Sequence, residues 1–220
     1  MAILKLKKTP ENLSFIDLGD SVELPPIGTF LLCISNKLNL NISPSFGFLS
    51  DYNTVCPSLS KIWPTTYMRS SLPCEGADGG APIFDLLGNF VGMMSVSIQE
   101  TRSSFIIPAR AIRRIRDDIL FSEKVSYAYI GIETDTSGRY VLKVSSNSPA
   151  DKAGLKEGDV LLKIGRFPIS KIDDVINAIF FSKPGNNLAV QVLRGKQEKE
   201  FSIHVAPRTD APVHPSKEKP

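Results

Sequence analysis

The stretch SPADKAGLKEGDVLLKIG, residues 148–165, decides the fold of the second half of the chain. Ser148 stands before Pro149 as a helix N-cap would, and Gly154 stands where a short helix would end, so residues 148–154 are predicted to form a short capped helix. The apolar run that follows predicts a strand over residues 160–164. The strands and the helix predicted on either side of this stretch are also short.

Outward from this stretch, strands are predicted over residues 129–132, 140–144, 188–193 and 200–204. Residues 171–181 predict a helix with Ile172, Val175, Ile176, Ile179 and Phe180 on one apolar face. Lys183-Pro184-Gly185 prevents that helix from continuing. Residues 208–220, rich in proline and charge, are predicted to be a disordered tail.

The first half of the chain has a different pattern, and residues 1–108 are predicted to form a barrel or sandwich of six short strands. Turn residues such as Pro25-Pro26 and Gly88-Asn89 separate the strands. An amphipathic helix follows at residues 109–120, within a linker over 109–124, and the second domain is expected over 125–207. The six predicted strands cover residues 27–35, 43–49, 65–71, 81–85, 90–97 and 103–108.

Composition excludes several classes of protein. The chain is 42% hydrophobic and 22% charged, which is typical of a soluble globular protein. A net charge of +3 gives no reason to expect a nucleic-acid partner. No apolar run reaches the roughly 18 residues of a membrane span, and no secretory signal is visible. Three cysteines, an odd number without metal-like spacing, indicate neither a disulfide framework nor a zinc site, and no metal or cofactor is predicted.

The second half resembles a PDZ domain. YIGI at residues 129–132 is similar to the carboxylate-binding loop of that family, and residues 148–165 are similar to its SPAxxAGLxxGDxIxxxxG segment. DDVINAI at residues 173–179, followed by KPG, matches the family's groove helix and the turn after it. Several spaced motifs in the correct order are far more specific than any one of them alone.

This resemblance implies a site for the C-terminal end of a peptide, which would add as a strand beside the loop. The successive backbone N–H groups of Ile130, Gly131 and Ile132 would receive the carboxylate. A glycine is needed at position 131 because a side chain would block the approach or forbid the backbone angles. Gly131→Val is therefore expected to abolish binding and leave the domain folded. The peptide-binding residues are predicted to be Tyr129, Ile130, Gly131, Ile132, Val175 and Ile179. Some of the apolar members are also expected to serve the core.

The first half resembles the second barrel of the trypsin fold, as found in the HtrA (Deg) family of serine proteases, whose protease domain is followed by a PDZ domain. Residues 15–36 are similar to the family's LPLGDS…VGxxVxAIGN stretch. GADGGAP at residues 76–82 and FIIPA at residues 105–109 are similar to its GNSGGP and FAIPS. The resemblance implies a mainly β chain: a single trypsin-like six-stranded barrel, a linker helix and a PDZ domain.

The catalytic groups of that family are not retained at the matching positions. Asp78 stands where the nucleophilic serine should be, in the oxyanion-hole-like turn that contains Gly76, Gly79 and Gly80. The triad histidine and aspartate are expected upstream of the chain as given, and His204 and His214 lie far from the matching position. A triad needs nucleophile, base and orienting group together, so no catalytic residue is predicted. The serines near the turn, Ser70, Ser71, Ser95 and Ser97, are expected to be ordinary strand residues, and Asp78 a turn residue.

The leading hypothesis is a non-catalytic HtrA-like pseudo-protease that binds exposed or C-terminal peptide segments through its PDZ domain. The alternative is a serine endopeptidase whose missing parts come from an upstream segment or a partner subunit. Self-association or pairing with an HtrA homologue is a further expected interaction. Residues 2–7 are expected to lie over the barrel or to leave an exposed apolar edge. The chain as given predicts a cytoplasmic protein, although the family often works in periplasmic or organellar spaces.

Overall fold

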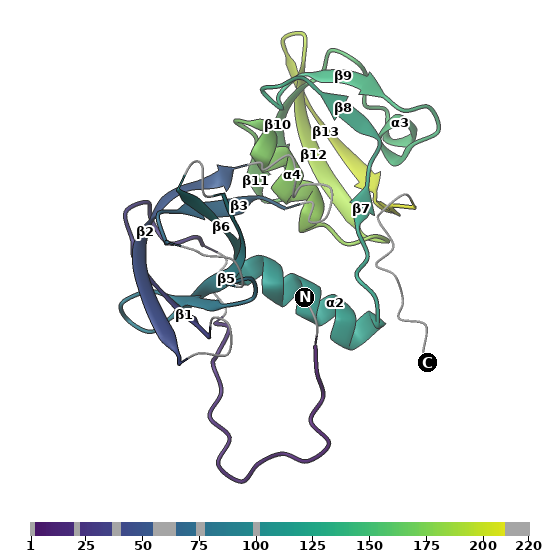
Figure 1. The fold of residues 1–220 in the computed structure, drawn as a ribbon. Helices are drawn as coiled ribbons and strands as arrows, with labels where there is room; N and C mark the ends of the chain where they lie inside the picture. The colour runs from purple at the N-terminus through teal and green to yellow at the C-terminus, as the bar shows by residue number, and fades with distance from the viewer. Residues whose placement is uncertain are drawn as a thin grey trace. The chain divides into compact units, whose positions relative to one another are not determined.

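The computed structural model of the chain describes residues 3–19, 23–36, 41–54, 65–73, 78–98 and 102–209. The chain divides into two compact units, shown as ribbons in Figure 1. The first unit comprises Met1–Thr54 and Tyr67–Glu123, and the second comprises Val55–Thr66 and Lys124–Pro220. The predicted tail lies outside the described residues from position 210 onward.

The first unit is a closed six-stranded antiparallel barrel with the strand order β1-β2-β3-β6-β5-β4. Inward and outward side chains alternate along β1, where Leu31, Cys33 and Ser35 are buried and Phe30 is exposed. This alternation places the apolar core inside the barrel. A six-stranded barrel is one of the two architectures that the sequence predicts. The strands are β1 (Phe30–Ser35), β2 (Ser43–Thr54), β3 (Tyr67–Ser70), β4 (Pro82–Phe84), β5 (Phe90–Ile98) and β6 (Ser103–Pro108).

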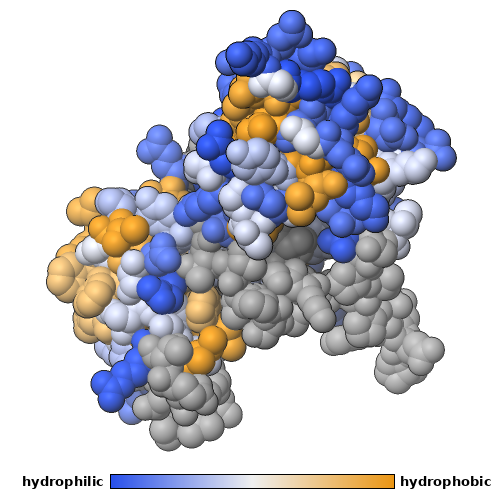
Figure 2. Space-filling view, turned by 90° about the horizontal axis from the view of Figure 1, so that it is seen from above, coloured by the Kyte–Doolittle hydropathy of each residue, from blue (hydrophilic) through white to orange (hydrophobic). Residues whose placement is uncertain are grey.

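Apolar side chains also gather on the outer face of the barrel. Phe30 pairs with Phe48 across β1 and β2, and Leu32 pairs with Phe46. Phe30, Phe46 and Phe48 keep about half or more of their side-chain surface exposed. Figure 2 shows hydrophobic side chains on the barrel, at the left of the view.

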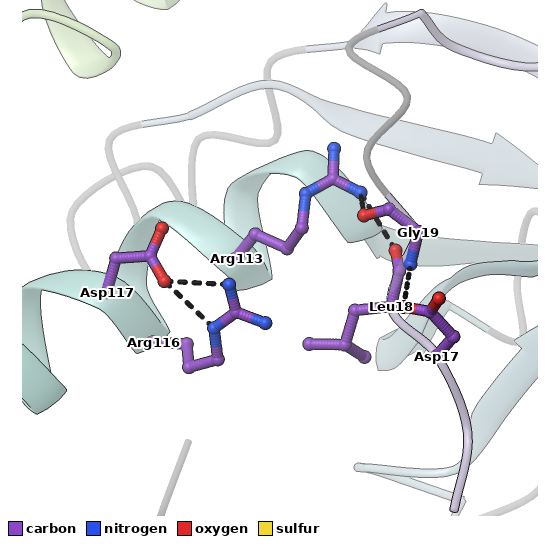
Figure 3. Close-up of polar contacts among 6 residues, drawn as sticks. All are labelled: Asp17, Leu18, Gly19, Arg113, Arg116 and Asp117. Atoms are coloured by element: carbon purple, nitrogen blue, oxygen red, sulfur yellow. Dashed lines mark hydrogen bonds and ion pairs between the residues drawn. The ribbon is translucent and has the colours of Figure 1, made fainter.

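Helix α2 (Ala109–Ser122) follows β6 and packs on β5 and β6. Its Arg113 holds the end of the N-terminal segment, because the guanidinium donates to the carbonyl oxygens of Leu18 and Gly19 (Figure 3). Asp17 accepts a hydrogen bond from the Gly19 N–H at 2.9 Å and tightens the same turn. The preceding residues 3–9 form no strand, so they present no strand edge, although Leu4 and Leu6 are exposed.

The second unit consists of short strands and two helices. A four-stranded sheet of order β11-β10-β12-β13 carries the core, and two small sheets pair β14 with β7 and β8 with β9. The strands are β7 (Ala128–Tyr129), β8 (Ile132–Thr134), β9 (Val141–Val144), β10 (Val160–Ile164), β11 (Phe167–Pro168), β12 (Asn187–Arg194), β13 (Gln197–His204) and β14 (Ala206–Pro207). The helices are α3 (Pro149–Ala153) and α4 (Ile172–Phe180).

The structure confirms the capped helix predicted at residues 148–154. The Ser148 side chain accepts a hydrogen bond from the Asp151 N–H at 3.2 Å, and Gly154 ends the helix with φ of 93°. The strand predicted over 129–132 is instead two strands, since the chain breaks at Ile130 and Gly131 between β7 and β8. That break positions the candidate site.

An ion pair between the buried Asp159 and the partly exposed Arg194 fixes the loop after α3 to the end of β12. Asp159 is fully buried and accepts two hydrogen bonds from the Arg194 guanidinium, at 2.6 and 2.8 Å. It also accepts the Lys156 N–H at 2.9 Å. Burial alone raises the pKa of Asp159, but the Arg194 guanidinium, the Lys156 N–H and the charge of Lys199 outweigh it, so the pKa lies below its ordinary value of 3.8.

The lowered pKa of Asp159 predicts an acid-sensitive second unit. The folded state binds fewer protons than the unfolded state near pH 4, so the stabilisation is complete above that pH and is lost as the pH falls through the folded pKa. Hydrogen exchange of β12 amides in the full chain at a series of pH values between 6 and 2 checks this. Arg194→Met should flatten the dependence, and an unchanged profile in that variant would contradict this origin.

Candidate peptide-binding site

The loop between β7 and β8 presents backbone N–H groups on one side. The Ile130 carbonyl accepts the Ala150 N–H and the Gly131 carbonyl accepts the Ser145 N–H, both at 2.9 Å. In a planar trans peptide the N–H points opposite to the C=O, so the N–H groups of Gly131 and Ile132 point away from α3 and β9. Among the described residues, none accepts a hydrogen bond from the Gly131 N–H. This arrangement suits an anion such as a carboxylate.

Gly131 is required at this loop for two separate reasons. Its φ is +84°, a conformation that other residues rarely adopt. A Cβ at this position would lie 2.2 Å from the Ser148 Cβ and 2.6 Å from its Oγ. The side chain introduced by Gly131→Val would therefore collide with the helix cap, so we expect this variant to destabilise the domain as well as to abolish binding.

The strand after the loop has one unpaired edge. Two hydrogen bonds fix the phase of the β8–β9 ladder, that is, which residue pairs exchange backbone hydrogen bonds. One runs from the Ser145 N–H to the Gly131 carbonyl, and the other from the Asp135 N–H to the Tyr140 carbonyl. In that phase Ile132 pairs with Val144, and Thr134 with Val141, at non-hydrogen-bonded positions. The N–H and C=O groups of Ile132 and Thr134 therefore point away from β9, which leaves them available to a further strand.

The six predicted peptide-binding residues differ in burial. Ile130 and Val175 are 2% and 4% exposed and belong to the core of the second unit. Ile132 and Ile179 are half-buried and pack against that core, and Tyr129 is 38% exposed. Ile130 and Val175 thus offer little surface, whereas Ile132 and Ile179 offer some.

Helix α4 contributes a residue that the predicted set omitted. Ile172, Ile176 and Ile179 are all half-buried and follow one another at spacings of four and three, so they share one helix face. Val175 and Ala178 face the core instead. The apolar periodicity of residues 171–181 included Ile176, but it could not distinguish a core-facing stripe from the adjacent half-exposed one.

Comparison with known proteins agrees with this division into two units. Residues 127–205 match the family model described as "PDZ domain". The chain is 28% identical over 207 residues to the serine endoprotease DegS of Haemophilus influenzae, with 88% of the chain and 59% of that protein covered. It is 23% identical over 234 residues to the putative serine protease HhoB of Synechocystis, with 94% and 55% covered. The chain thus spans a little over half the length of these curated relatives.

Solved structures of the same class share the fold. The HtrA-type protease AlgW with a tripeptide superposes with a TM-score of 0.71 at 21% identity, covering 92% of this chain and 72% of that one. AlgW with a decapeptide gives a TM-score of 0.66 at 22% identity, covering 91% and 66%. The chain is thus similar to HtrA-type serine proteases over most of its length, and its residues 127–205 match a PDZ domain. The predicted fold class is confirmed.

In this HtrA-like chain, the turn that matches the family's nucleophile turn places Asp78 just before β4. Asp78 is 3% exposed, and its carbonyl accepts the Ala81 N–H at 3.0 Å. Gly79 and Gly80 are exposed, and the Gly80 N–H donates to the Met94 carbonyl at 2.8 Å. Gly76 lies outside the described residues. The turn role predicted for Asp78 fits the bond to Ala81.

The hydroxyls and the imidazole considered for catalysis in the HtrA-like chain have structural surroundings. The Ser71 hydroxyl accepts the Phe48 N–H at 3.0 Å, and Ser70 is buried in β3. Ser95 and Ser97 lie in β5. His204 lies at the end of β13, where its Nδ1 is 3.1 Å from the Asn187 Oδ1. His214 lies outside the described residues.

Proposed function

We propose that this HtrA-like protein binds the C-terminal ends of peptides through its PDZ domain and does not cleave them. The observation that carries the proposal is the pair of outward N–H groups at Gly131 and Ile132, next to the unpaired edge of β8. The peptide carboxylate would accept these N–H groups, and the last residues would extend the β8–β9 sheet by one strand. AlgW, a structural relative, has been solved with a tripeptide and with a decapeptide.

The slot for the last side chain is proposed between Ile132 on β8 and Ile176 and Ile179 on α4. These three are half-buried, so they still have apolar surface to cover. Ile130 and Val175 would form the floor beneath them, and Tyr129 would stand beside the loop. An apolar C-terminal residue is therefore the expected ligand chemistry.

We propose the loss of catalysis because residue 78 is an aspartate where a nucleophilic serine would be needed. Attack by a carboxylate on an amide would give an anhydride that collapses back, so Asp78 cannot replace a serine in acyl transfer. An oxyanion hole stabilises developing negative charge, which a fixed carboxylate at the same turn would oppose. Both arguments depend only on residue 78, so they hold even if further residues precede Met1. Partners are accordingly proposed to be peptide segments, including those of HtrA homologues or of a second copy.

Within the part of the chain that the structure describes, no helix combines the length and the apolar character that crossing a membrane requires.

Peptides with free and amidated C-termini test the binding proposal. Octapeptides Lys-Thr-Val-Lys-Thr-Ala-Thr-X, with X as Val, Leu or Phe, are titrated into the full chain by calorimetry. Amidation should weaken the best binder about 10- to 100-fold, because a hydrogen bond to a charged group contributes about 1.5–3 kcal/mol. Ile179→Asp should weaken binding to a similar degree, and Leu142→Asp, at a residue that is 60% exposed on β9, should not. Equal binding of acid and amide, or no binding, would refute the carboxylate site.

A further inference from the structure

A further pocket of the second unit lies at the end of α4, away from the proposed peptide groove. It has a volume of about 450 Å³ and is lined by the β10–β11 turn, β11, the end of α4 and the start of β12. β11 itself packs on α4 (Figure 1). At about 100° per residue, Phe181 lies roughly 160° round the helix from Ile179, which faces the groove. The pocket and the groove are therefore on nearly opposite sides of α4.

The pocket has an apolar floor and aromatic walls. Ile164, Ala178 and Val205 line it and are buried in the core, so they form its floor. Phe167 and Phe181 are half-buried, with ring centroids 6.0 Å apart and ring planes at 19° to one another. Both rings keep exposed apolar surface, which an aromatic group of a ligand would cover.

The rim of the pocket is positively charged. Arg166 and Lys183 are exposed, and among the described residues neither has a hydrogen-bond or ion-pair partner. The guanidinium carbon of Arg166 lies 5.0 Å from the ring centroid of Phe167 and 5.8 Å from that of Phe181. Contact with the rings orients the guanidinium and leaves the N–H donors at its edge available to a carboxylate. None of the described lining residues is acidic, so the local charge favours an anionic ligand.

We infer that this pocket is a second peptide-binding site, which takes an internal segment with an aromatic residue between two acidic ones. The aromatic side chain packs on the Phe167 and Phe181 rings, and the flanking carboxylates pair with Arg166 and Lys183. The walls are half-buried and the rim is exposed, so the pocket covers one side of its ligand, whereas a small-molecule site buries most of the ligand surface. The inference goes beyond the proposed function, because this site needs no free C-terminus and uses none of the groove residues.

An acidic peptide without a free C-terminus tests the inference on the full chain. Acetyl-Gly-Ser-Asp-Phe-Asp-Ser-Gly-amide is titrated by calorimetry and should bind. Replacement of both aspartates by asparagine should weaken binding about fivefold, because each exposed ion pair contributes modestly. Replacement of the phenylalanine by serine should weaken it about tenfold or more, because the aromatic ring is then no longer buried. Failure of the parent peptide to bind would overturn the inference.

Removal of the two rim charges distinguishes a specific site from general charge attraction. The double variant Arg166→Gln, Lys183→Gln should bind the Asp-Phe-Asp and Asn-Phe-Asn peptides equally. Lys156→Gln with Lys196→Gln is the matched control, since it removes the same charge at exposed residues that do not line the pocket. The control should keep the full preference for aspartate. Equal loss of that preference in both double variants would overturn the inference.

Competition shows whether the two sites are separate. The octapeptides titrated for the groove contain lysine and no acidic side chain, so the pocket should not take them. Saturation with the best octapeptide should change the affinity for the acidic peptide by less than about twofold, as for independent sites. Displacement would place the acidic peptide in the groove and overturn the inference, with the proposed function left standing. Binding of 3-phenylpropionate as tightly as the peptide would assign the pocket to small aromatic acids, and would also overturn it.

Discussion

Arg194→Met is expected to lower the free energy of unfolding of the second unit by about 3–5 kcal/mol, as removal of one partner of a buried ion pair does. Asp159 has no exposed surface, and its two oxygens accept the Arg194 hydrogen bonds. Methionine fills similar space, but it leaves the carboxylate buried without its cation. The same guanidinium also donates to the Gly154 carbonyl at 2.9 Å and lies 5.1 Å from the Phe201 ring centroid.

Hydrogen exchange of β12 amides in the full chain measures this loss within the second unit. Lys143→Met is the matched control, because its ion pair with Glu133 is about 60% exposed on both sides. That variant should cost less than about 1 kcal/mol. If the two variants destabilise the unit equally, the Asp159–Arg194 pair does not have the structural role assigned to it.

Gly131→Ala is expected to destabilise the second unit by about 2–5 kcal/mol. Positive φ costs a non-glycine residue about 1–2 kcal/mol, and forcing an extra group into a packed site costs about 1–3 kcal/mol. The second cost arises from Ser148, whose Cβ and Oγ lie within 2.6 Å of the new methyl position. Peptide binding would fall as a consequence of the loop's displacement.

Gly154→Ala separates the cost of a positive φ from the cost of the steric collision. Gly154 also has a positive φ, of 93°, but the nearest atom to its Cβ position is Phe201 Cε1 at 3.6 Å. This variant should therefore show the backbone cost alone, so it should be the milder of the two when urea unfolding of the full chain is followed. A Gly154→Ala loss as large as that of Gly131→Ala would mean that the collision with Ser148 is relieved at little cost.

Much of the fold was predictable because its signals are local. The Ser148 cap, the glycine at position 154 and the alternation along β1 each depend on neighbouring residues, and the structure shows all three. The break between β7 and β8 was not predicted, because residues 129–132 are apolar on both sides of it. The pair of Asp159 and Arg194 joins residues 35 positions apart and has no signal in a single sequence.

The sequence predicts the motif that forms the candidate site, but it does not predict which side chains line the site. The motif YIGI locates the loop and Gly131, but a run of apolar residues cannot show which side chains the core takes. The sequence therefore does not separate Ile130 and Val175 from Ile132 and Ile179, and it does not single out Ile176. The close approach of Gly138 to Ile172 is likewise revealed only by the folded structure.

Hydrolysis of unfolded casein, followed by mass spectrometry alongside fluorophosphonate labelling, tests directly whether the protein binds peptides without cleaving them. The expected result is intact casein and no labelled serine after prolonged incubation with the full chain. Cleavage that disappears in Asp78→Ala, or a labelled serine whose replacement by alanine stops cleavage, would contradict the account.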